Sequence, residues 1–73
     1  MTTRWFWTGS GSRCLASIDY MPATQMLDLQ FRSGKTYRYT GVPPGAARRL
    51  IRGHSKGRAF HHNIYQRYPY VRL

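Results

Sequence analysis

A chain of 73 residues, 41% of them hydrophobic, can bury one small core, which excludes both a wholly disordered chain and a deep, enclosed active site. Its 12 Lys and Arg residues face only two carboxylates, and the formal net charge of +10 predicts a positive surface that attracts nucleic acid, anionic membrane or an acidic protein. The single cysteine, Cys14, excludes an intrachain disulfide and favours a reducing compartment.

We predict that this compartment is the cytoplasm. No apolar run approaches the roughly 20 residues that a membrane-spanning helix needs, and the start of the chain lacks the hydrophobic region of a signal peptide. We therefore expect a cytoplasmic monomer with no membrane partner.

Residues 1–12 are predicted to form a flexible aromatic leader. Three consecutive aromatic residues, Trp5, Phe6 and Trp7, precede the segment 8–12, which has the Gly and Ser composition of a flexible linker. Two interpretations are open. Either a tryptophan folds back to cover the small core, or the leader is an adhesive arm that docks on a partner.

Residues 13–65 are predicted to form a single domain that begins with three strands. Alternation of apolar and polar side chains favours strands over residues 15–21, 26–31 and 36–40. Gly34 lies in the turn between the second and third strands, where a tight hairpin needs a residue with positive φ. The pattern predicts a small, half-buried antiparallel sheet.

The third predicted strand carries Tyr37 and Tyr39 on one face and Arg38 on the other. Aromatic side chains on an open sheet can stack on bases, as in proteins that bind single-stranded RNA. Alternatively, the two tyrosines pack in the core with the apolar residues of the preceding strand, and two-residue alternation favours this second interpretation.

Two short helices are predicted after the sheet. Pro44 suits the first turn of a helix with apolar residues at helical spacing, and Gly53 is expected to end it. Ser55 can cap a second helix, and residues 66–73 are predicted to form an extended tail. The expected fold is therefore α+β, with a small three-stranded antiparallel sheet, one or two short C-terminal helices, a flexible leader and a tail.

The sequence predicts neither catalysis nor a bound cofactor or metal. Asp19 and Asp28, the only carboxylates, are expected at outward strand positions among many arginines, where a solvated or ion-paired role is favoured over acid–base chemistry. The segment 34–36 resembles the end of a phosphate-binding P-loop but lacks the motif's first glycine and its helix. The histidines and the cysteine form no recognised metal-ligand spacing.

Two basic segments are candidates for nucleic-acid binding. Arg32, Lys35 and Arg38 lie on and around the predicted hairpin, where they could hold phosphates. Lys56 and Arg58 lie in the first turn of the second predicted helix, where backbone N–H groups and the helix dipole favour an anion. A solvated turn explains this second segment about equally well.

Between Ser12 and Tyr70 the sequence resembles the KTSC domain, a small module found at the C-terminus of some lysyl-tRNA synthetases and as a stand-alone bacterial or phage protein. The segments that carry the resemblance are residues 31–39 with the central Tyr-x-Tyr, residues 41–43, and residues 55–58 leading to Phe60 and Ile64. Ala59 stands where a bulky residue is expected, and His61 where such domains often have Asn. The resemblance implies a β-rich α+β fold, no enzymatic activity, and RNA binding as the suggested role.

The whole chain is also similar to small lytic-phage transcription regulators that bind host RNA polymerase, in its size, basic character and aromatic leader. That similarity implies a non-enzymatic inhibitor of transcription initiation that interferes with σ-factor engagement. Trp5, Phe6 and Trp7 would then anchor the partner, and Ser17 would meet a docking peptide if its strand lies at the sheet edge. The polymerase is the predicted partner, and a KTSC-type nucleic-acid-binding module is the alternative.

Overall fold

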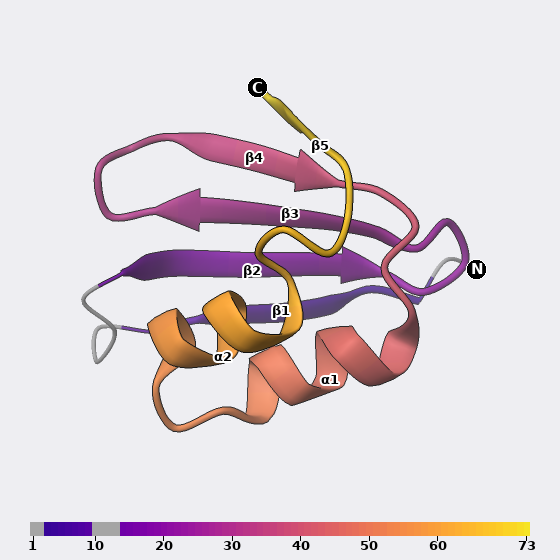
Figure 1. Ribbon diagram of the computed structural model, residues 1–73, viewed down its shortest axis with the longest axis horizontal. Helices are drawn as coiled ribbons and strands as arrows, with labels where there is room; N and C mark the ends of the chain where they lie inside the picture. Colours follow the sequence, from indigo (N-terminus) through magenta and orange to yellow (C-terminus); the bar gives the residue numbers. More distant parts are fainter. Residues whose placement is uncertain (1–2, 10–13) are drawn as a thin grey trace.

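The computed structural model describes residues 3–9 and 14–73. These residues form a five-stranded antiparallel sheet and two helices. The elements in chain order are β1 (Trp5–Thr8), β2 (Leu15–Met21), β3 (Met26–Phe31), β4 (Thr36–Tyr39), α1 (Pro44–Arg52), α2 (Lys56–Asn63) and β5 (Tyr70–Arg72). Figure 1 shows both helices on the same side of the sheet, so the fold has two layers.

The fold is α+β, but the prediction of a three-stranded sheet is wrong. Residues 5–8 of the predicted leader form β1, and residues 70–72 of the predicted tail form β5, so the strand order is β1-β2-β3-β4-β5. Residues 1–2 and 10–12 of the predicted leader lie outside the described residues. The three central strands and both helices lie where the sequence pattern places them.

The two missed strands are short and depend on partners elsewhere in the chain. β1 (Trp-Phe-Trp-Thr) begins with three consecutive aromatic residues and β5 has only three residues, so neither shows a clear alternation of apolar and polar side chains. Trp5 pairs with Tyr20 in β2, and Tyr70 pairs with Tyr39 in β4 after the chain has passed through both helices. Pairing with an existing sheet, rather than local propensity, therefore decides their structure.

The core lies between the sheet and the helices. Tyr37 and Tyr39 belong to its covered face, because β4 pairs them with Leu29 and Leu27 of β3. Tyr39 is 4% exposed, which confirms the core-packing interpretation of this strand. The buried hydrophobic residues are Leu15, Ile18, Tyr20, Leu27, Leu29, Tyr39, Val42, Ala46, Ala47, Leu50 and Ile64.

The predicted turns and caps are present. Gly34 has a φ of 94° in the β3–β4 turn. The Ser55 hydroxyl accepts a hydrogen bond of 3.3 Å from the backbone N–H of Arg58 and so caps α2. Gly53 follows α1, and a Cβ atom placed on it would lie 2.6 Å from the Cβ of Ala59. The two helices therefore meet at a distance that only glycine permits.

Burial of two tyrosines makes the stability of the fold decrease at alkaline pH. Burial raises the pKa of Tyr39 from 10.0 to about 12, and the hydroxyls of Tyr70, Tyr37 and Tyr65 add to the rise. Burial also raises the pKa of Tyr20. The folded protein thus holds these phenolic protons more tightly than the unfolded chain does, so their contribution is complete below pH 10 and lost as the pH rises toward 12.

We accordingly expect the free energy of unfolding to fall between pH 10 and pH 12, beyond any general effect of changing net charge. Urea titrations at stepped pH measure this fall. In Tyr39→Phe the fall should be shallower, because one of the two shifted groups is gone. A fall of the same steepness in Tyr39→Phe would show that this hydroxyl does not set the pH dependence.

Candidate functional site

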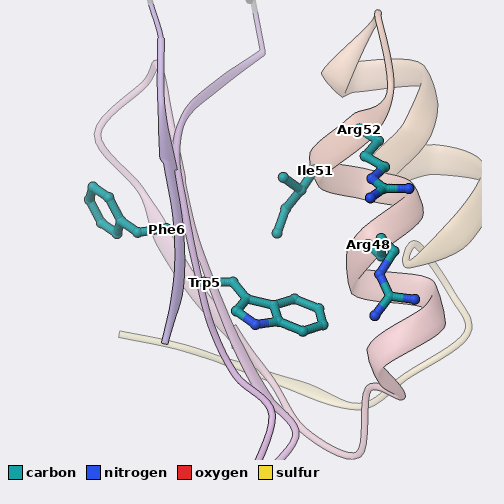
Figure 2. A pocket seen from close by; sticks show the side chains of 5 residues that line it. All are labelled: Trp5, Phe6, Arg48, Ile51 and Arg52. Atoms are coloured by element: carbon teal, nitrogen blue, oxygen red, sulfur yellow. The ribbon is translucent and has the colours of Figure 1, made fainter. Parts of the chain in front are cut away.

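The outer side of β1 forms one edge of the sheet and carries a cavity. The cavity has a volume of about 270 Å³ and is lined by Trp5, Phe6, Arg48, Ile51 and Arg52. Figure 2 shows Trp5 and Ile51 between the sheet and α1, while Phe6 leaves the opposite face of β1. The cavity therefore joins an unpaired strand edge to the side of a helix.

Packing fixes β1 in this place. Trp5 and Trp7 are half-buried and pack on the core, and the Trp5 ring lies 5.1 Å from that of Tyr20. The Tyr20 hydroxyl in turn donates a hydrogen bond of 2.6 Å to the carbonyl of Val42. Phe6 points outward and is 57% exposed. The tryptophans therefore cover the core, as the first interpretation of the leader expects, whereas Phe6 is left exposed.

Cations lie over each aromatic ring of β1. The guanidinium carbon of Arg4 is 5.2 Å from the Phe6 ring centroid, and that of Arg48 is 5.4 Å from Trp5. The Lys56 amine is 4.8 Å from Trp7. These contacts keep positive charge beside apolar rings. We call the resulting site the β1 edge surface; it consists of Arg4, Trp5, Phe6, Trp7, Arg48, Ile51, Arg52 and Lys56.

Charge is distributed unequally between the two layers. Both carboxylates lie side by side on the open face of the sheet, since Asp19 pairs with Asp28 across β2 and β3. Arg4 bonds Asp19 at 2.7 Å and Arg38 bonds Asp28 at 2.9 and 3.0 Å. The hydrogen bond to Asp28 raises the pKa of Arg38 above its ordinary value. No acidic residue lies on α1 or α2, so the excess positive charge concentrates on the helix side.

The predicted protein-binding residues are only partly brought together. Trp5, Phe6 and Trp7 share the β1 edge surface. The condition set for Ser17, that its strand lies at the sheet edge, is not met, because β1 pairs with β2 and makes β2 an interior strand. Its hydroxyl donates a hydrogen bond of 3.5 Å to the Gln30 side chain.

The five predicted nucleic-acid-binding cations are dispersed. Arg32 donates to the carbonyl of Gly9, Lys35 is exposed in the β3–β4 turn, and Arg38 is paired on the open sheet face. Lys56 is the first residue of α2, donates a hydrogen bond of 2.5 Å to the carbonyl of Gly53 and lies over the Trp7 ring. Arg58 is exposed. The anion site at the start of α2 stays a prediction.

Sequence reasoning missed Arg48, Ile51 and Arg52 as lining residues of the cavity. The sequence did show that Arg48 and Arg52 share a cationic face of the first predicted helix and that Ile51 belongs to its apolar face. Nothing local indicated that Trp5 would pack beside that helix.

Among residues 3–9 and 14–73, no cluster of three or more His, Cys, Asp or Glu side chains could hold a metal ion. No helix in the same part of the chain has the length and apolar character needed to cross a membrane.

The family model of the KTSC domain matches residues 11–68, which include β2, β3, β4 and both helices. The chain belongs to the KTSC domain family. An uncharacterized protein of Stutzerimonas stutzeri (strain A1501) is 40% identical over 63 residues, a match that covers 85% of this chain and 89% of the relative. A lysine–tRNA ligase of Nostoc sp. (strain PCC 7120) is 41% identical over 54 residues, which are 74% of this chain and 10% of the ligase.

A crystal structure of a KTSC domain protein from Yersinia pestis has the same fold, with a TM-score of 0.87 and 34% sequence identity. The match covers 97% of this chain and 99% of the Yersinia chain. Because the match leaves out only 3% of this chain, it extends into the segments that form β1 and β5. The names of these three proteins mention neither a phage nor transcription, so the similarity to phage regulators is still a hypothesis.

Proposed function

We propose that this KTSC domain is a non-catalytic regulatory protein that docks as a monomer on bacterial RNA polymerase in the cytoplasm and inhibits transcription initiation. One observation carries the docking: an exposed phenylalanine on an unpaired edge strand, beside a cavity rimmed by two arginines. The choice of polymerase as partner rests on the similarity of the whole chain to small lytic-phage regulators.

The β1 edge surface suits an acidic protein partner in three ways. The outer backbone groups of β1 can pair with an added strand. Phe6 supplies an exposed aromatic anchor, the residue type enriched in the cores of interfaces. Arg48 and Arg52 can meet carboxylates beside an apolar cavity, and the net charge of +10 speeds the encounter. Occupation of an acidic surface that σ factor uses would block initiation.

Replacing Phe6 with alanine is expected to weaken retention of polymerase at least about tenfold, because an exposed anchor in the centre of a contact carries much of its binding energy. The measurement is a pull-down of purified bacterial RNA polymerase on the immobilised protein, together with a promoter-dependent initiation assay. Leu73→Ala is the matched control, since Leu73 is 59% exposed and lies beyond β5 at the other edge. Lack of polymerase retention by the unmodified protein would refute the proposal.

Nucleic-acid binding is the second candidate function. The relation to part of a lysine–tRNA ligase and the concentration of cations on the helix side support it. Binding through phosphates should weaken steeply as salt is added, with a log–log slope of about −0.7 for each contact to a single strand. A shallow slope at all salt concentrations would argue against this function.

A further inference from the structure

Five aromatic side chains between the end of the sheet and α2 form a ring in which each contacts the next. The ring centroids are separated by 5.5 Å for Phe31–Tyr37, 5.4 Å for Tyr37–Tyr70, 5.3 Å for Tyr70–Tyr39, 5.9 Å for Tyr39–Phe60 and 5.4 Å for Phe60–Phe31. Tyr65 joins them through Phe60 at 5.9 Å. The six side chains line a cavity of about 200 Å³, which we call the aromatic pocket.

The aromatic pocket has a buried end and an open end. Tyr39 is 4% exposed, whereas Tyr65 is 43% and Tyr70 is 58% exposed. The outer two rings therefore present aromatic surface to solvent next to a cavity that already has apolar walls. A flat ligand can stack on them with little change in the protein.

A pocket walled by aromatic rings suits either an organic cation, through cation–π attraction, or a flat base, through stacking. Charge decides between them. The protein carries +10, and both carboxylates are on the open face of the sheet and paired with arginine. A free cation is repelled by this field, whereas a base attached to phosphates is attracted.

Two cations are placed to contact those phosphates. Arg72 is two residues from Tyr70 on β5 and is paired with Tyr37, so its side chain leaves the same face of the sheet as the pocket. Lys35 is exposed immediately before β4. A hydrogen bond of 2.8 Å from the N–H of Leu73 to the carbonyl of Thr36 holds the end of β5 beside this turn.

We infer that the aromatic pocket binds one unpaired base of a single-stranded nucleic acid, with Lys35 and Arg72 at the flanking phosphates. The base must be unpaired, because a duplex hides the faces of its bases in the stack. This inference rests on nucleic-acid binding, the second candidate function, and is independent of docking on polymerase, because β1 and β5 are opposite edges of the sheet.

The test compares two labelled oligomers by fluorescence anisotropy, an oligodeoxyadenylate about 12 nucleotides long and an abasic oligomer with the same number of phosphates. The protein should bind the base-bearing oligomer about tenfold more tightly than the abasic one. Tyr70→Ala and, separately, Tyr65→Ala should remove this difference and leave the affinity for the abasic oligomer unchanged. An oligoadenylate RNA in a parallel arm shows whether the 2′-hydroxyl adds to the affinity.

Val71→Ala is the matched control. Val71 is on the same strand as Tyr70, is 57% exposed against 58%, and points to the opposite face of the sheet. Its substitution should leave both affinities as they are. Equal binding of both oligomers by the unmodified protein would overturn the pocket while leaving nucleic-acid binding by charge in place. No binding of either oligomer at low salt would overturn the pocket and the second candidate function together.

Discussion

Gly53→Ala is expected to lower the free energy of unfolding by about 3 kcal/mol, the upper end of the usual cost of overpacking. The added methyl group would lie 2.6 Å from the Cβ of Ala59 and 3.3 Å from the carbonyl oxygen of Arg49. Neither atom is the end of a flexible side chain, so α1 and α2 must move apart. Urea denaturation followed by circular dichroism measures the loss.

Two companion variants separate this clash from a general effect of replacing glycine. Gly45→Ala, within α1, meets only the end of the Arg49 side chain at 3.7 Å and should stabilise the protein by up to about 1 kcal/mol. Ala59→Gly combined with Gly53→Ala should recover part of the lost stability, because the opposing methyl group is gone. Additive effects of the two substitutions would show that the contact is not the cause.

Arg52→Glu is expected to weaken docking on polymerase by about 30-fold, or 2 kcal/mol, because it places a negative charge at the cavity rim where an acidic partner must lie. The dissociation constant and the association rate, measured by surface plasmon resonance at several salt concentrations, test this. The difference from the unmodified protein should shrink as salt screens the charges.

Arg67→Glu is the control for this reversal. It changes the net charge by the same amount, but Arg67 is exposed beyond α2 and donates to the carbonyl of His62. Its effect should be limited to a small decrease in the association rate. Equal weakening by both variants would mean that overall charge, rather than the β1 edge surface, governs the interaction.

The sequence predicted those parts of the fold that leave a local pattern. Alternation over seven residues identified β2 and over six residues identified β3. Gly34 identified the turn between β3 and β4, and Pro44 and Ser55 identified the starts of the helices. The edge strands could not be recognised in this way, because they consist of a few residues stabilised by pairing with a sheet that other segments build. Because the leader and the tail were not recognised as strands, the residues that complete each candidate site were missed.

Each site is assembled from segments that are distant in the sequence. Trp5 and Arg48 meet only because β1 lies beside α1, and Tyr70 reaches Tyr39 only because β5 pairs with β4. The aromatic leader and the Tyr-x-Tyr strand were recognised as important from composition and alternation alone. Their partners were not, since contacts between distant segments leave no periodic signal.

The two open edges of the sheet also affect whether copies of the chain associate with one another. An edge with unpaired backbone groups invites a second copy to add its own edge and continue the sheet. Here Arg4 directly precedes one edge strand and Arg72 ends the other, and each copy carries +10. Joining two such edges would bring like charges together across the new junction, so self-assembly into filaments is disfavoured. The unpaired backbone groups of each edge are then left available to pair with an acidic strand of a partner.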